Sequence, residues 1–252
     1  MMLPIITDPA FYAVAVPAVL LMGLSKSGFG AGFGALAVPL MALTVPVPQA
    51  AAIMLPLLAV MDITGLQSLA RHADRSLLKL LIPAGLVGTL VGTASFGLLP
   101  AATVAGVVGA LTLAFLAQRK LWPPRADVHQ SPLWVGGLLG VAAGFTSFVA
   151  HAGGPPLMAY VLPMRLAPLR FAGTCAVFFA AINASKWIPY AALGLIDLRG
   201  LATSLLLMPL APIGVWVGVR LAQRVSPVWF YRLVEVGMLA TGGKLLWDGF
   251  AG

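Results

Sequence analysis

The sequence predicts an all-α polytopic integral membrane protein made of two inverted structural repeats, with about 8–10 membrane helices and two Gly-rich helix breaks. Of its 252 residues, 60% are hydrophobic and only 9% are charged, and the mean hydropathy is +1.00. A soluble domain of this length does not need so much apolar surface. The apolar segments lack the alternation of apolar and polar residues that marks a membrane barrel, so the spans are expected to be helical.

The charged and reactive residues argue against several other classes of protein. A net charge of +8 suggests nucleic acid binding in a soluble protein, but most basic residues here fall in short loops, where the positive-inside rule accounts for them. Cys175 is the only cysteine, which excludes an internal disulfide framework and a cysteine-rich metal site. Of three histidines, only His151 lies within an apolar segment, so we expect neither an enzyme nor a bound metal or cofactor. Asp8 and the lack of a basic N-terminal region predict a first helix rather than a signal peptide.

Proline and glycine positions divide the chain into ten helical segments. In order, these are expected at residues 10–25, 32–44, 48–70, 76–97, 101–120, 132–149, 155–164, 167–195, 199–223 and 227–248. The third, fourth, fifth, eighth, ninth and tenth segments reach the length of about 20 residues that a bilayer requires. The segments beside the two breaks are shorter, so we expect half helices or strongly tilted helices there, which either span the membrane or re-enter it.

Basic residues orient these segments in the membrane. They gather in four connections, at residues 71–79, 119–125, 165–170 and 220–232. Placing these connections in the cytoplasm puts both chain ends outside. The third and eighth segments then run in opposite directions, which makes the halves inverted repeats. The expected organisation is a first transmembrane repeat at 1–122, a cytoplasmic linker at 123–131 and a second transmembrane repeat at 132–252.

Matching residues in the two halves support the repeat. Gly23 and Gly144 are 121 residues apart, and so are Asp62 and Asn183. Later in each half a second offset, of 126 residues, relates Gly88 to Gly214. The alternative is that a chain rich in Gly, Ala, Leu and Pro matches itself by chance.

The first Gly-rich break points to an anion site. Lys26 lies between two apolar segments, where a lysine is rare without a partner or a function. The glycines after it leave backbone N–H groups free at the start of the next helix, and a helix N-terminus beside an ammonium favours an anion. The alternative is that Lys26 extends to the membrane interface. Serine hydroxyls here can donate to an oxyanion or pack at helix contacts. The candidate substrate-binding residues of this break are Ser25, Lys26, Ser27, Gly28, Gly30 and Gly32.

The second break carries a histidine in place of the lysine. His151 can donate a hydrogen bond to an anion or, when protonated, couple transport to pH, and a structural bond to a neighbouring carbonyl explains it equally well. Gly153 and Gly154 let the backbone approach a ligand, and the prolines that follow suit the start of a helix. Thr146 and Ser147, one turn earlier, complete the candidate substrate-binding residues of this half.

A third group of polar residues lies deeper in the apolar segments. Asp62 needs a partner or a proton there, and Lys26 and Asn183 are the candidate partners. A protonatable Asp62 is a candidate for proton coupling, and a polar tie between helices is the alternative. Lys186 follows Asn183 by three residues on the same helical face, where it either adds positive potential to a pathway or extends outward.

Two segments resemble a known family. The segment from Gly23 to Leu40, with its Gly-rich break, small-residue run and Val38-Pro39-Leu40 close, resembles the signature of the sulfite exporter TauE/SafE family. The segment from Gly144 to Tyr160 is similar to the family's second copy, and the resemblance covers nearly the whole chain. It implies a transporter of the bacterial inner membrane for small anions, often sulfur-containing ones such as sulfite and sulfonates. The family's break residues would fall on 25–34 and 151–156.

The residues and the resemblance together predict a transporter for a small anion, most directly sulfite or an organosulfonate. Alternating access is the expected mechanism, and proton coupling is a hypothesis. A transporter or channel for another solute such as a carboxylate, and a non-transporting membrane subunit, are the alternatives. The expected partners are the anionic solute and membrane lipid, with a homo-oligomer left open and no nucleic acid.

Overall fold

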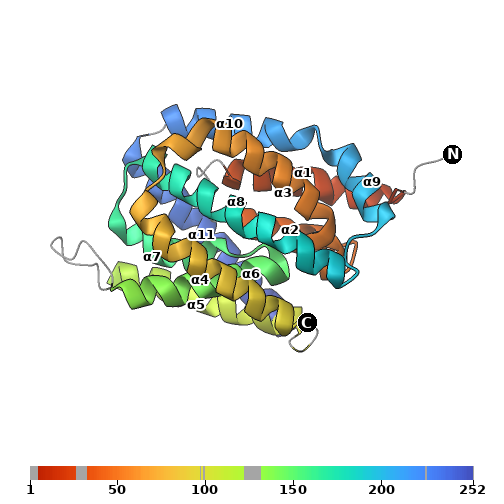
Figure 1. The fold of residues 1–252 in the computed structure, drawn as a ribbon, viewed down its shortest axis with the longest axis horizontal. Helices are drawn as coiled ribbons and strands as arrows, with labels where there is room; N and C mark the ends of the chain where they lie inside the picture. Colours follow the sequence, from red (N-terminus) through yellow and green to blue (C-terminus); the bar gives the residue numbers. More distant parts are fainter. Residues whose placement is uncertain are drawn as a thin grey trace.

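The computed structural model describes residues 5–26, 33–96, 98, 100–121, 132–224 and 226–251. All regular elements in these ranges are helical, as the sequence predicts (Figure 1). The helices are α1 (Pro9–Lys26), α2 (Ala37–Met41), α3 (Val47–Leu69), α4 (Arg75–Ala94), α5 (Ala101–Leu121), α6 (Leu133–Ala150), α7 (Gly154–Val161), α8 (Pro168–Ala192), α9 (Leu198–Leu207), α10 (Leu210–Arg224) and α11 (Pro227–Ala251). Short 3₁₀ turns are η1 (Phe33–Leu36), η2 (Ala70–His72) and η3 (Leu162–Met164). The expected linker at 123–131 lies outside the described residues.

Local sequence signals set several of these boundaries. The Asp74 side chain caps α4 by accepting hydrogen bonds from the backbone N–H groups of Ser76 and Leu77. Asp197 caps α9 in the same way, through the N–H of Gly200. Prolines at the first turns of α3, α7 and α8 suit those helices because their N–H groups have no intrahelical partner there.

Five helical stretches are long and apolar enough to cross a membrane. They are α1, α3 continued through η2, α4, α6 and α8, and the bent pair of α9 and α10 makes a sixth. Helices α5 and α11, with 21 and 25 residues, also have the length of a span. If both cross the membrane, the number of membrane helices reaches the lower end of the expected range of about 8–10. The chain is therefore a multi-pass membrane protein.

Two expectations about individual helices were wrong. The segment expected to be continuous over 199–223 is broken between α9 and α10, which meet at an angle of 47°. Pro209 lies in the break, and proline removes a helical hydrogen bond and clashes with the preceding turn. The segments expected at 10–25 and 132–149, before the two breaks, were not counted among those long enough to cross the membrane, but α1 and α6 are 18-residue candidate spans.

The helices pair in a pattern that is unchanged when the two halves are exchanged. At the centre α3 packs on α8, α1 packs on α10, α4 on α6, and α5 on α11. In the predicted repeat, α1 of the first half corresponds to α6 of the second, and α4 corresponds to α9 and α10. The α1·α10 pair therefore corresponds to the α6·α4 pair. Glycines lie at both crossings: Gly23 contacts Gly214, and Gly144 contacts Gly85. The pairing is compatible with two repeats, and their inverted relation stays a prediction.

Basic connections lie at one end of the molecule, away from the start of α1 and the end of α11. The α3–α4 and α7–α8 connections, which carry basic residues, lie at the left in Figure 1, as does the basic end of α10. Helix α1 begins and α11 ends at the right. The helices also differ in how deeply they are buried: 67% of the α3 span and 56% of the α8 span lie inside the protein, against 33% for α4. The interior of the molecule is therefore built around the crossing of α3 and α8.

Candidate functional site

An ion pair joins the first break to the middle of α3. Lys26 is the last residue of α1, and its Nζ lies 2.7 Å from Oδ1 of Asp62. The two side chains are only 7% and 8% exposed. The Lys26 ammonium also lies over the ring of Phe179 on α8, 5.2 Å from its centroid, where the ring face attracts a cation. The structure thus confirms that Lys26 is a partner of Asp62 and that it does not extend to the membrane interface.

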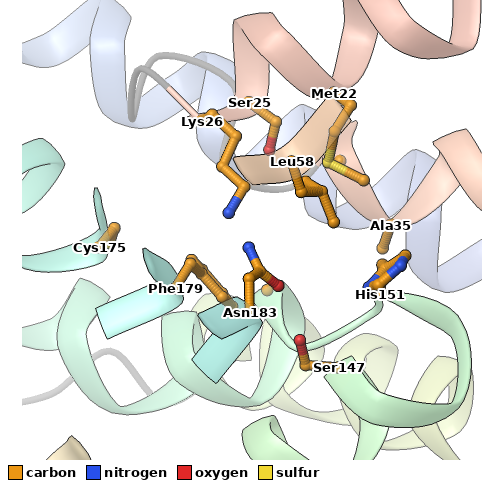
Figure 2. Close-up of a pocket in the computed structure, with 12 residues that line it drawn as sticks. Met22, Ser25, Lys26, Ala35, Leu58, Ser147, His151, Cys175, Phe179 and Asn183 are labelled. Atoms are coloured by element: carbon orange, nitrogen blue, oxygen red, sulfur yellow. The ribbon is translucent and has the colours of Figure 1, made fainter. Parts of the chain in front are cut away.

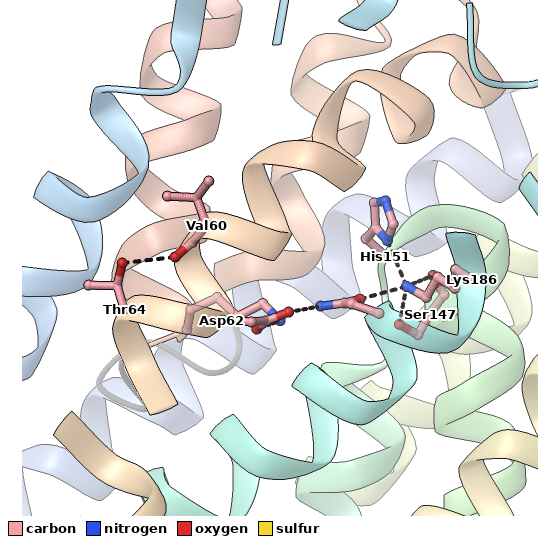
Figure 3. Close-up of polar contacts among 8 residues, drawn as sticks. Val60, Asp62, Thr64, Ser147, His151 and Lys186 are labelled. Carbon is pink, nitrogen blue, oxygen red and sulfur yellow. Dashed lines mark hydrogen bonds and ion pairs between the residues drawn. The ribbon is translucent and has the colours of Figure 1, made fainter. Parts of the chain in front are cut away.

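The polar chain continues from α3 to α8. The side-chain NH₂ of Asn183 donates to Oδ2 of Asp62 at 2.7 Å, and the Asn183 Oδ1 accepts from Nζ of Lys186 at 2.9 Å. Both ends of the amide have partners, so its orientation follows from the network. Figure 3 shows these contacts running from Asp62 towards His151. The matched residues of the two halves, Asp62 and Asn183, therefore meet directly.

Lys186 lies at the other end of this chain and is fully buried. Besides Asn183, its Nζ contacts the carbonyl oxygen of Ser147 at 2.8 Å, the Ser147 hydroxyl at 2.7 Å and Nδ1 of His151 at 2.8 Å. The His151 Nε2 lies 3.0 Å from the carbonyl oxygen of Ala51, which can only accept, so Nε2 carries a proton. In the neutral imidazole, Nδ1 is then an acceptor and suits the lysine that faces it. Three obligate acceptors thus surround Nζ, and only an ammonium has three hydrogens to donate to them.

His151 also ends helix α6. Its backbone has φ 51°, in the left-handed region that is uncommon for residues other than glycine, although histidine is enriched there. The backbone N–H of His151 donates to the same Ser147 carbonyl that Lys186 contacts. Residues held in such conformations cluster at functional sites. The turn directs the imidazole between α3 and α8, where both ring nitrogens have partners.

A pocket lies beside this network (Figure 2). The space open to the centre of a water-sized molecule is about 30 Å³, and one water needs roughly 10–15 Å³ by the same measure. The pocket therefore has room for about two waters or for one ion of a few heavy atoms. The residues that line it come from both halves of the chain: Met22, Ser25, Lys26, Gly34, Ala35, Leu58, Ser147, His151, Gly154, Cys175, Phe179 and Asn183.

The structure brings many of the expected residues to this pocket. Of the expected substrate-binding residues, those that line it are Ser25, Lys26, Ser147, His151 and Gly154. Of the deeper group, Asn183 lines it, while Asp62 and Lys186 contact residues that line it. Lys186 is inside the protein and does not extend outward. Ser27, Gly28, Gly30 and Gly32 lie outside the described residues.

Thr146 and Gly153 have different surroundings. The Thr146 hydroxyl donates to the carbonyl oxygen of Ala142, one turn earlier in α6. At Gly153 an added Cβ would lie 2.5 Å from the carbonyl oxygen of Ala143, so a glycine is needed for the close approach of this backbone to α6. Neither residue lines the pocket.

Sequence reasoning missed five residues that line the pocket: Met22, Ala35, Leu58, Cys175 and Phe179. Gly34 also lines it and lies in the expected break range 25–34, but it was not a candidate residue. Two of the five carried a usable signal. Cys175, Phe179 and Asn183 follow one another at intervals of four residues, which places them on one face of α8. Nothing in the sequence distinguished Met22, Ala35 and Leu58 from other apolar residues.

Short helical elements begin at the pocket on both sides. Gly34 and Ala35 belong to η1, which leads into α2, and Gly154 is the first residue of α7. The N-terminus of a helix carries partial positive charge and directs N–H groups outward. Together with the Lys26 ammonium, these features suit an anion. Among the described residues, no group of three or more His, Cys, Asp or Glu side chains could hold a metal ion.

Comparison with known proteins identifies the family of the chain. No curated protein and no solved structure matches the chain significantly. The model of the sulfite exporter TauE/SafE family matches residues 15–245, which include both breaks and every residue named above as lining the pocket. The chain therefore belongs to the sulfite exporter TauE/SafE family, a family of membrane transporters.

Proposed function

We propose that this chain transports a small oxyanion, sulfite or an organosulfonate, across the bacterial inner membrane. The observation that carries the proposal is the pocket itself, in which the Lys26 ammonium, the Ser25 and Ser147 hydroxyls and the first residue of α7 face a space the size of a small ion. Each of these groups donates hydrogen bonds or carries positive charge, which favours an oxyanion as ligand. Family membership supports transport as the activity.

Alternating access is the mechanism that the helix pairing favours. The pocket lies where the two predicted repeats meet, with α1 and η1 on one side and α6, α7 and α8 on the other. Glycine contacts at the α1·α10 and α4·α6 crossings bring helix backbones close together, so these pairs can move as units. Rocking one set of helices against the other would open the site to each side in turn.

Proton coupling is a second part of the proposal. Asp62 is the only carboxylate in the polar chain, and His151 is its only imidazole. Either group could carry a proton with the anion. Sulfite flux in liposomes that is indifferent to an imposed pH gradient would remove this part of the proposal.

The test is radiolabelled sulfite flux in liposomes, with Lys26→Ala compared with wild type. Flux is expected to fall to background because the ammonium at the pocket is gone. Removing Lys26 alone leaves Asp62 buried without its counter-ion, at a cost of about 3–5 kcal/mol. The double variant Lys26→Ala/Asp62→Asn removes that carboxylate charge as well, so it separates a binding defect from a folding defect.

Lys244→Ala is the matched control. Lys244 pairs with Asp248 on α11, as Lys26 pairs with Asp62, but it does not line the pocket. Its flux should equal that of wild type. Wild-type flux in Lys26→Ala would contradict the proposed site, and absence of sulfite and sulfonate flux in wild type would contradict the proposed substrate.

A further inference from the structure

We propose that the site selects for one net negative charge, so that it takes a monovalent oxyanion such as an alkanesulfonate or hydrogensulfite in preference to a divalent one such as sulfate. This inference rests on the proposed function and specifies its substrate class. It is carried by the buried charges of the polar chain, which are those of Lys26, Asp62 and Lys186.

The charge of the empty site follows from its hydrogen bonds. Lys26 is paired with the carboxylate of Asp62, so these two charges cancel. Among the described residues, no carboxylate contacts Lys186, and its three obligate acceptors require an ammonium. His151 is neutral because its Nδ1 accepts from that ammonium. The remaining residues that line the pocket have no formal charge. The site therefore carries one net positive charge.

One bound monovalent anion makes this site neutral. A divalent anion leaves one uncompensated negative charge inside the protein, where burial of an unpaired charge is expensive. Pocket size does not separate the two classes, because methanesulfonate and sulfate both have four heavy atoms around a tetrahedral sulfur. Charge is thus the property by which this pocket can distinguish them.

Asp62 and Asn183 set the net charge of the site. They are matched residues of the two halves, they contact each other at 2.7 Å, and each faces one of the lysines. A carboxylate at both positions would give no net charge, and an amide at both would give two positive charges. One of each is the combination that suits a monovalent ligand.

The test compares methanesulfonate with sulfate on the purified full-length protein. Dissociation constants come from ligand-dependent thermal stabilisation, since only the folded protein binds the ion. Competition with labelled sulfite flux in liposomes gives the same ratio independently. Wild type is expected to bind methanesulfonate at least about tenfold more tightly than sulfate, a difference of about 1.4 kcal/mol.

Asp62→Asn raises the site charge to two and should shift the ratio towards sulfate by at least about tenfold. The exchanged variant Asp62→Asn/Asn183→Asp should restore the wild-type ratio. In it the amide at 62 can accept from Lys26 and donate to the carboxylate at 183, which then faces Lys186, so every bond of the network has a counterpart. Lys186→Gln lowers the site charge to zero and should weaken methanesulfonate binding at least about tenfold.

Asp74→Asn is the matched control. It makes the same chemical change at the N-cap of α4, where asparagine also caps, and it lies away from the pocket. Its ratio should equal that of wild type. If Asp62→Asn is not monodisperse, the exchanged variant and Lys186→Gln test the inference instead. The exchanged variant has to keep the wild-type ratio of sulfate to methanesulfonate dissociation constants, and Lys186→Gln has to lose methanesulfonate binding.

The outcomes separate this inference from the proposed function. A wild type that transports sulfite but prefers sulfate over methanesulfonate overturns the inference alone. So does a folded Asp62→Asn variant with an unchanged ratio, or an exchanged variant that does not restore it. A wild type that binds and transports none of these anions overturns the proposed function, and the inference with it.

Discussion

Adding one methyl group at Gly144 should separate α6 from α4 and disable the site. An ideal Cβ at Gly144 would lie 1.9 Å from the carbonyl oxygen of Gly85, which is backbone and cannot turn aside. Ordinary contact begins near 3.4 Å, so Gly144→Ala requires the helices to part by about 1.5 Å at this crossing. Overpacking of this kind costs about 1–3 kcal/mol.

The same displacement reaches the polar network. Ser147 lies one turn after Gly144, and its hydroxyl is 2.7 Å from Nζ of Lys186. Helix α8, which carries Lys186, packs on α4, so we expect a shift of α6 away from α4 to move Ser147 away from Lys186 as well. A shift of about 1.5 Å lengthens this contact beyond hydrogen-bonding distance. Both stability and anion flux should therefore fall.

Thermal unfolding of the purified protein measures the first effect. For a domain of about this size, 1 kcal/mol corresponds to about 2–4 °C, so the midpoint should fall by about 2–12 °C. Gly137→Ala is the matched control, because it makes the same change on the same helix where an added Cβ has no neighbour within 4 Å. Its midpoint should stay the same or rise, since alanine favours helix. Equal midpoints for the two variants would refute the close contact between α4 and α6.

Two further predictions concern the pocket and its support. Cys175, the only cysteine, lines the pocket but is buried, so its labelling by maleimide should be slow. Methanesulfonate should slow this labelling further in wild type but not in Lys26→Ala; a labelling rate that does not change with the anion would place the ligand elsewhere. Tyr190→Phe removes the hydroxyl that donates to the carbonyl oxygen of Phe148 at 2.6 Å, and should lower the free energy of unfolding by about 1–3 kcal/mol in thermal or denaturant unfolding. An unchanged unfolding midpoint would contradict this bond.

The sequence predicted the fold where local signals are strong. Apolar segments of span length and prolines near their ends were enough to place α3, α4, α5 and α8 to within a few residues. The break between α9 and α10 was missed, although Pro209 was visible. A proline inside an apolar segment either bends a helix slightly or ends it, and α3, which continues through Pro56, shows that the local sequence does not decide between these outcomes.

The candidate site was predictable to the extent that polar residues in apolar segments are rare. Lys26, Asp62 and His151 stood out for that reason, and the offset of 121 residues already related Asp62 to Asn183. Two partners of Lys186, Ser147 and His151, were not predictable, because they meet it only through the packing of α6 against α8. The apolar lining residues depended in the same way on tertiary contacts.

Each half supplies one ammonium to the site, and the two lysines come from helices that do not correspond in the two halves. By the offset of 121 residues, Lys26 matches Ser147, and Lys186 matches Gly65. Lys186 contacts Ser147, while an added Cβ at Gly65 would lie 3.8 Å from the backbone oxygen of Lys26. Each half thus has one ammonium at the same contact between its helices, although the lysine comes from α1 in the first half and from α8 in the second. In the polar chain, the carboxylate of Asp62 has the amide of Asn183 as its counterpart, so the positive charge that favours an anion arises from one difference, a carboxylate in one half and an amide in the other.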